Sequence, residues 1–206
     1  MAKIGFFGAS FDPITNSHLW TATKIAEEYN LSQVIMGPGS NKRPDKQMNI
    51  SDAHRWNLLQ LAISNDSLFV ADDFEMKQDA SAIYTYFTME HYKQLYPLDQ
   101  VYFIMGADLL VDIAKGEWLY GKELVENNLF LVMSRDGINM KEVISSSAFL
   151  QPYSEHFHLI EKGMNMEISS SYIRGELRKH PNARHLKHLM PCPCYDYIME
   201  HGLYQF

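Results

Sequence analysis

Cysteine is almost absent from this chain of 206 residues, which contains only Cys192 and Cys194. Two cysteines so close together cannot join distant parts of a fold, so we expect stability to come from the core. Long apolar runs are missing too, and the apolar segment 4–7 is too short for the core of a signal peptide. We therefore expect a cytoplasmic protein with no membrane partner.

Basic residues are also few, since 18 Lys and Arg oppose 25 Asp and Glu and the net charge is −7. Broad nucleic-acid binding depends on cations that neutralise phosphates, so we expect no nucleic-acid partner. A small site for an anionic ligand remains compatible with this charge, because a few local cations can oppose the net sign. The oligomeric state leaves no trace in the sequence.

Repeats, low-complexity blocks and flexible linkers are not visible, so residues 1–206 are expected to form a single domain. Standard metal-site patterns are missing as well. His185, His188, Cys192 and Cys194 do not have the spacing of a structural zinc site, and we expect no metal bound by the protein itself.

Short apolar runs alternate with segments of helical periodicity along the chain. Strands are expected at 3–7, 33–36, 67–71, 101–105 and 129–133, and helices at 17–29, from Ser51 onwards, and at 84–96. This alternation predicts an α/β fold with a doubly wound, mainly parallel sheet and a small C-terminal helical part. Ligands of such sheets bind beyond the carboxyl ends of the strands, here just after residues 7, 36, 105 and 133.

The segment from Gly8 to His18 follows the first predicted strand, and it is neither a Walker A loop nor a G-x-G-x-x-G fingerprint. Gly8 would let the backbone approach a ligand. A helix that begins near Ser17 would present free amides and a positive dipole end to a phosphate. Thr15 and His18 can point toward one pocket, where the imidazole would donate to a phosphate oxygen. The alternative is that Ser17 merely caps the helix and His18 is exposed.

Residues 8–18 read Gly-Ala-Ser-Phe-Asp-Pro-Ile-Thr-Asn-Ser-His, which resembles the nucleotidyltransferase signature G-x-F-[DN]-P-x-H-x-G-H. More specifically, the segment resembles the nicotinate/nicotinamide mononucleotide adenylyltransferases, with Thr15 in place of the first histidine, as in eukaryotic-type members. The resemblance implies a Rossmann-like nucleotidyltransferase fold that transfers AMP from ATP to a pyridine mononucleotide, with Mg²⁺ carried mainly by ATP. It implies that His18 and Thr15 are catalytic.

Two further motifs resemble this family and follow in the family's order. Residues 168–174, Ile-Ser-Ser-Ser-Tyr-Ile-Arg, resemble the I-S-S-[ST]-x-I-R motif, and residues 106–108 match the G-A-D motif. Without the resemblance, the first would be an ordinary capped helix, and the second a tight turn with Asp108 as N-cap. With it, the implied ATP contacts are Gly8, Ser10, Phe11, His18, Gly106, Asp108, Ser169, Ser170, Ser171 and Arg174.

Weaker matches imply a site for the mononucleotide. Trp118 resembles the family tryptophan that stacks on the pyridine ring, although core packing is the ordinary role of a tryptophan. The basic loop 42–46 offers Lys42, Arg43 and Lys46, of which Lys42 is favoured. Thr85 lies in a partial match to S-Y-T-x-D-T, and Arg135 in Arg-Asp-Gly. The implied mononucleotide contacts are Ser10, Phe11, Lys42, Thr85, Trp118 and Arg135.

The closing segment 191–204 resembles the family's last helix and its Gly-Leu-Tyr ending, so the resemblance covers residues 3–204. Two other functions remain open: a related transferase that acts on phosphopantetheine or a polyol phosphate, and a nucleotide-binding protein without turnover. The sequence does not decide between nicotinate and nicotinamide mononucleotide. It also leaves open whether His54 and Arg55 form a surface pair or an edge of the phosphate site.

Overall fold

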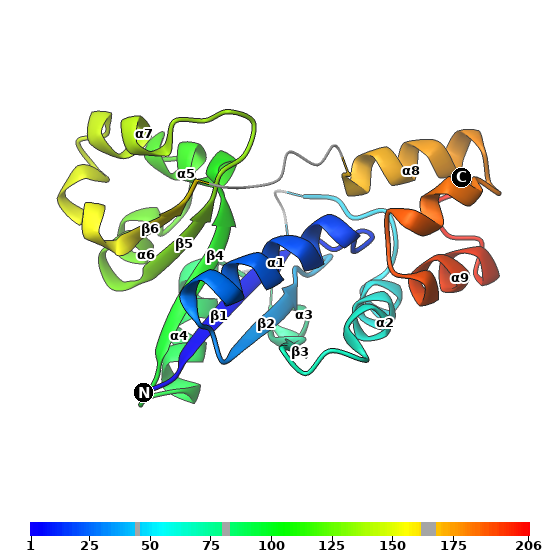
Figure 1. Cartoon of the computed structure of the whole chain (residues 1–206), viewed down its shortest axis with the longest axis horizontal. Coiled ribbons are helices and arrows are strands. Elements are labelled where there is room, and N and C mark those ends of the chain that lie inside the picture. Colours follow the sequence, from blue (N-terminus) through cyan, green and yellow to red (C-terminus); the bar gives the residue numbers. More distant parts are fainter. Residues whose placement is uncertain (44–45, 80–82, 162–167) are drawn as a thin grey trace.

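A computed structural model describes residues 1–43, 46–79, 83–161 and 168–206. Its sheet has six parallel strands in the order β3-β2-β1-β4-β5-β6, which confirms the predicted doubly wound α/β fold (Figure 1). The strands are β1 (Lys3–Ala9), β2 (Gln33–Pro38), β3 (Phe69–Ala71), β4 (Gln100–Gly106), β5 (Leu129–Met133) and β6 (Phe157–Ile160).

Four strands differ in their boundaries from the sequence prediction, and one strand was missed. β2 extends to Pro38 instead of ending at residue 36, and β4 spans Gln100–Gly106 instead of 101–105. β1 continues through Gly8 to Ala9, because both residues pair with the end of β2. β3 begins at Phe69 rather than at residue 67. The edge strand β6 is only four residues long, Phe-His-Leu-Ile, which is too short to show a period.

The helices α1, α2 and α4 confirm the three predicted ones. Ser51 caps α2 and Asn30 ends α1 in a left-handed conformation, both as expected. No helix in the described ranges has both the length and the apolar character to cross a membrane. The helical elements are α1 (Asn16–Tyr29), α2 (Asp52–Ile63), α3 (Phe74–Lys77), α4 (Thr85–Leu95), α5 (Ala107–Ala114), α6 (Gly121–Asn127), α7 (Met140–Ser146), η2 (Gln151–His156), α8 (Ser170–Lys179), η3 (Arg184–His188) and α9 (Cys192–Glu200).

The alternation of side chains along β4 divides the core into two layers. Val101, Phe103 and Met105 pack with residues of α4 to α7, whereas Tyr102 and Ile104 belong to the cluster that contains α1, α2, α8 and α9. Both faces of the sheet are therefore buried, as the continuously apolar strands at 101–105 and 129–133 predicted.

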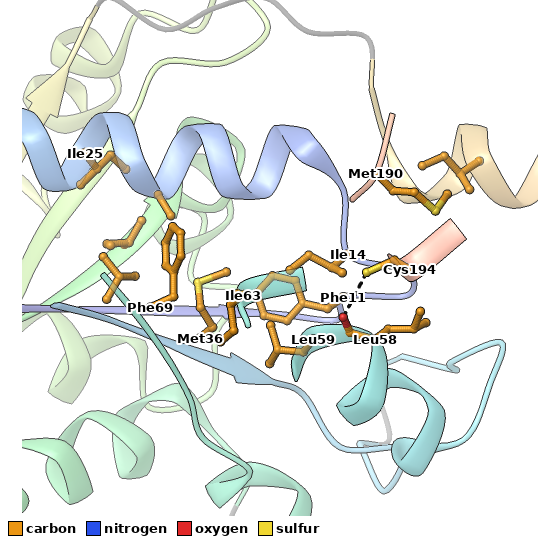
Figure 2. Packing of buried hydrophobic residues seen from close by; sticks show 14 of the residues in the cluster. Phe11, Ile14, Ile25, Met36, Leu58, Leu59, Ile63, Phe69, Met190 and Cys194 are labelled. Carbon is orange, nitrogen blue, oxygen red and sulfur yellow. Dashed lines mark hydrogen bonds between the residues drawn. The ribbon is translucent and has the colours of Figure 1, made fainter. Parts of the chain in front are cut away.

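The C-terminal helices pack against the segment that follows β1 and against α2. Phe11 and Ile14 of that segment lie among Leu58, Met190 and Cys194 in one buried cluster (Figure 2). The Cys194 thiol donates to the backbone oxygen of Leu58 at 3.2 Å. The small C-terminal helical part thus forms one wall around the first loop of the sheet.

Asp12, buried in this loop, anchors the end of the chain. Its Oδ1 accepts from the Tyr204 hydroxyl at 2.8 Å, and its Oδ2 accepts from the backbone and side-chain nitrogens of Asn49, each at 2.8 Å. Burial and the Asp12 carboxylate raise the pKa of Tyr204, so the phenol keeps its proton and remains a donor. The hydrogen bond joins residues 192 positions apart in the sequence.

Tyr204→Phe tests this anchor, because it removes one hydroxyl and leaves the ring in place. We expect the free energy of unfolding to fall by about 1.5–3 kcal/mol, the contribution of a hydrogen bond to a charged group. Urea denaturation measures the change. Tyr172→Phe is the matched control, since Tyr172 is 46% exposed and its loss should cost less than about 0.5 kcal/mol. Equal stabilities of the two variants would contradict the role of Asp12 as an anchor.

Candidate functional site

Four loops meet at the carboxyl edge of the sheet. β1 and β2 are paired up to Ala9 and Pro38, and β4 and β5 up to Gly106 and Met133. Because all the strands are parallel, the loops that follow these four strands emerge on the same side. The structure thereby brings Ser10, Lys42, Asp108 and Arg135 to one edge, as the sequence predicted.

Thr15 and His18 form a capping box at the start of α1. The Thr15 hydroxyl accepts from the His18 backbone nitrogen at 3.4 Å, and His18 Nδ1 accepts from the Thr15 backbone nitrogen at 3.0 Å. Thr15 is therefore the N-cap, and the predicted helix start at Ser17 was wrong by one residue. Thr15 is fully buried, so any effect it has on a ligand acts through His18.

The capping box also fixes the proton of the His18 imidazole. A backbone N–H can only donate, so Nδ1 is an acceptor, and the proton of the neutral ring lies on Nε2. Burial, together with the charges of Arg135 and Lys46, lowers the pKa of His18 to about 4. His18 is therefore neutral near pH 7 and carries one N–H donor that the cap does not use.

The backbone oxygens at the end of β1 and in the loop that follows it accept hydrogen bonds from donors in other elements. Ala9 O accepts from Gly39 N at 2.9 Å, and Ser10 O accepts from the Arg55 guanidinium at 2.6 Å. Asp12 O accepts from Arg174 at 2.6 Å, and Pro13 O accepts from the Ser170 hydroxyl at 2.8 Å. Four carbonyl dipoles that would repel a phosphate are thus neutralised by protein donors.

The serine motif reaches this loop from the far end of the chain. Ser169 caps α8 by accepting from Tyr172 N at 3.1 Å, as its position before a helix predicted. Ser170 and Arg174 hold Pro13 and Asp12, from which they are separated by 157 and 162 positions. Arg174 also donates to the Ser171 hydroxyl at 3.1 Å. The two motifs recognised in the sequence therefore form one structural unit.

Asp108 and Arg135 form a second polar group, at the ends of β4 and β5. Arg135 Nη1 lies 3.5 Å from Asp108 Oδ2, while Asp108 Oδ1 is buried without a hydrogen-bond partner among the described residues. A Cβ atom on Gly106 would lie 2.3 Å from that oxygen, so a larger residue there would displace the Asp108 carboxylate. Gly106, not Asp108, is the N-cap of α5, and that alternative role for Asp108 was wrong. A buried oxygen without a partner calls for an explanation, and a bound water, ion or ligand group is one.

Two residues predicted as ligand contacts have evident packing roles. A Cβ atom on Gly8 would lie 2.9 Å from the Phe6 ring, so packing also requires glycine there. Phe11 is only 1% exposed, and its ring packs edge-on against the His18 imidazole with centroids 5.2 Å apart. The ligand contact of Phe11 stays a prediction for a residue that is packed away from solvent, whereas Ser10 is partly exposed.

Trp118 and α4, the helix that begins at Thr85, lie on the face of the sheet opposite to α1 and α2. Trp118 packs on Phe103 with centroids 6.2 Å apart, and it also lines a cavity of about 300 Å³ with Tyr120. Tyr120 in turn contacts Tyr84, the N-cap of α4, at 5.4 Å, and Thr85 is the first residue of that helix. The contact with Phe103 agrees with the core-packing role of Trp118, and its stacking on a pyridine ring stays a prediction.

The three cations of the loop after β2, Lys42, Arg43 and Lys46, have different surroundings. Lys42 Nζ donates to the backbone oxygen of Gln78 at 2.9 Å. Arg43 and Glu75 both lie close to Gly39, and a Cβ atom there would be 3.5 and 3.7 Å from their side chains. Lys46 is exposed and helps to lower the pKa of His18. Of the three cations, Lys46 is thus the one whose charge acts on His18, whereas the sequence favoured Lys42 as the phosphate contact. Residues 44 and 45 of this loop lie outside the described ranges.

Sequence reasoning missed the importance of Arg55, which is 0% exposed and donates to Ser10 O. The surface alternative for Arg55 was wrong, while His54 is partly exposed and contacts the Tyr197 hydroxyl at 3.0 Å. The signal was present in the sequence, because Arg55 precedes Leu58 and Leu59 by three and four residues and so shares their buried face.

His185, His188, Cys192 and Cys194 take no part in a metal cluster in the described ranges, which contain no group of three or more His, Cys, Asp or Glu suited to a metal ion. Cys192 is exposed, whereas burial raises the pKa of Cys194 to about 12.

Comparison with known proteins agrees with this geometry. Residues 6–176 match the model of the cytidylyltransferase-like family. A probable nicotinate-nucleotide adenylyltransferase of Carboxydothermus hydrogenoformans is 35% identical over 205 residues, which cover 99% of this chain and 98% of that protein. One of Clostridium tetani is 31% identical over the whole of both chains.

A solved structure shows the same arrangement. The nicotinic acid mononucleotide adenylyltransferase of Plasmodium falciparum, complexed with NaAD, superposes with a TM-score of 0.77 at 26% identity, and the match covers 100% of this chain and 98% of that one. Sequence and fold thus agree along the whole length, and the chain belongs to the cytidylyltransferase-like family and, within it, to the nicotinate-nucleotide adenylyltransferases.

Proposed function

We propose that this protein transfers the AMP part of ATP to nicotinate mononucleotide and releases pyrophosphate, which makes the dinucleotide in NAD biosynthesis. The observation that carries the proposal is the docking of the α8 motif on the loop that leads into α1 and His18, through Ser170 to Pro13 and Arg174 to Asp12. This places a cation and a neutral N–H donor beside one loop, an arrangement suited to phosphates.

In the proposed reaction, a phosphate oxygen of the mononucleotide attacks the α-phosphorus of ATP. The new P–O bond forms as the bond to pyrophosphate breaks, and the electron pair leaves with pyrophosphate. The attacking phosphate is already an anion, so the protein has no proton to remove. Its contribution is to position the reactants and stabilise charge. His18 Nε2–H would donate to an α-phosphate oxygen, while Arg174 and the serines of α8 would hold the leaving phosphates.

Mg²⁺ fits this proposal as an ion that arrives with ATP. The most buried carboxylate near the loop, Asp12, is already engaged by Tyr204 and Asn49. Mg²⁺ commonly keeps several waters and binds through substrate phosphates. When bound, the ion would neutralise charge on the triphosphate, and His18 and Arg174 would act on the remaining oxygens.

Two observations support nicotinate over nicotinamide as the base. The relatives described above are named for nicotinate. In addition, the N-cap residue Tyr84 forms no side-chain hydrogen bond with the N-terminus of α4, an 11-residue helix that starts at Thr85 beside Tyr120. Free amides and the positive end of the helix dipole favour a carboxylate over a neutral amide. The cytoplasmic location, the single domain and the lack of a nucleic-acid partner stay predictions of the sequence.

Pyrophosphate release tests the reaction. With ATP and Mg²⁺, we expect turnover to be fastest with nicotinate mononucleotide, slower with nicotinamide mononucleotide and absent with phosphopantetheine. ATP binding by calorimetry, without pyrophosphate release from any acceptor, would instead identify a nucleotide-binding protein without turnover.

His18→Gln separates the two roles of His18. Glutamine at this position can still complete the capping box through its amide oxygen, but its amide N–H₂ does not reproduce the position and direction of the imidazole Nε2–H. We expect kcat to fall about 10²- to 10³-fold, the usual effect of losing one donor to a transition-state oxygen, with an unchanged circular dichroism spectrum. His201→Gln is the matched control, since His201 is exposed and lies in the C-terminal turn of α9. Near-normal turnover in His18→Gln would refute a catalytic His18.

The lowered pKa of His18 has a consequence for stability. Histidine has a pKa of about 6.5 in an unfolded chain and His18 has a pKa of about 4 in the folded protein. Between these values the unfolded chain binds the proton and the folded protein does not. The free energy of unfolding should therefore decrease as pH falls from about 6.5 to about 4. Urea denaturation at several pH values should show a shallower decrease for His18→Gln; equal slopes would contradict a neutral, buried imidazole.

A further inference from the structure

Arg55 contacts the loop after β1 and the loop after β2, but protein covers its side chain completely. Its side chain is 0% exposed, which is rare for arginine and requires that its charge be paired. The partner is Asp52, one turn earlier on α2. An arginine so fully covered by protein is placed to hold backbone rather than to meet a substrate.

The first contact of Arg55 is with the loop that follows β1. Nη1 donates to Ser10 O at 2.6 Å, next to Phe11, whose backbone has a φ of 44°. A non-glycine residue in this left-handed region carries strain and persists only where its surroundings impose it. Arg55 and Arg174 hold the backbone oxygens of the residues before and after Phe11, Ser10 and Asp12, and so help to impose it.

The second contact of Arg55 is with the loop that follows β2. Nη2 donates to Asn41 Oδ1 at 3.3 Å, and Asn41 N donates to Asp52 Oδ1 at 2.9 Å. Each of the residues Asn41, Asp52 and Arg55 thus contacts the other two. Asn41 directly precedes Lys42 in the sequence. One planar guanidinium therefore joins the loop of Ser10 and His18 to the loop of Lys42.

We infer that Arg55 is a positioning residue for adenylyl transfer, which sets the separation of these two loops and thereby places the mononucleotide phosphate for attack on ATP. The expected effect on kcat/KM rests on the proposed function, whereas the connection of the two loops by Arg55 does not. Lysine cannot replace Arg55, because a single ammonium group lacks the planar fork that donates in two directions. ATP should be less affected, since Ser170 and Arg174 reach the first loop without Arg55.

Arg55→Lys tests the inference, with Arg184→Lys at an exposed arginine as the matched control. We expect kcat/KM for the mononucleotide to fall about 10- to 100-fold, as a displacement near 1 Å would cause, and the KM for ATP to change less than threefold. The control should keep wild-type values. Asn41→Ala is a milder second variant on an exposed residue and should give a smaller loss in the same direction. The double variant should be no worse than Arg55→Lys alone, because both changes break the same connection.

Hydrogen exchange gives a readout independent of turnover. In Arg55→Lys, we expect faster exchange in peptides that cover residues 8–15 and 38–43, and unchanged exchange in α5 and α6. Wild-type kinetics with unchanged exchange would overturn the inference. So would faster exchange throughout the molecule, which would indicate general destabilisation. If the wild-type protein turns over no pyridine mononucleotide, the proposed function fails, and the exchange pattern still decides whether Arg55 holds the two loops.

Discussion

The need to satisfy the backbone oxygens of the loop after β1 governs the arrangement of this site. Ala9, Ser10, Asp12 and Pro13 each present a carbonyl that a phosphate would avoid, and a buried carbonyl without a donor is costly. The donors come from the loop after β2, from α2 and from α8. These elements therefore converge on the loop, and α9 packs beside α2 (Figure 1).

This constraint also explains how the protein manages without a glycine-rich phosphate cradle. In such a cradle, glycine supplies unusual backbone angles at little steric cost. Here Phe11 adopts a φ of 44°, and its ring is buried among Ile14, Leu58 and Cys194 (Figure 2). Core packing and the donors on both sides together hold the shape that glycine would otherwise permit.

The charge of the site opposes the charge of the molecule. The chain carries −7 overall, yet Arg135 and Lys46 lower the pKa of His18 together with burial. The same local positive charge, together with burial, keeps His18 neutral, and the Thr15 backbone directs its single proton to Nε2. A donor of this kind does not depend on pH near neutrality, because its protonation lies well below that range.

The sequence by itself determined the fold class, five of the six strands and the two motifs that carry the site. Periodicity and strand-end residues are local signals, and the motif around His18 identifies the family without any knowledge of packing. Only the tertiary structure decided that Thr15 rather than Ser17 caps α1, that Phe11 is packed away, and that Arg55 is buried between two loops. Those outcomes depend on contacts such as Tyr204 with Asp12 or Arg174 with Asp12, which span 192 and 162 positions. No local pattern encodes such pairs, since their partners become neighbours only when the parallel strands and the C-terminal helices come together.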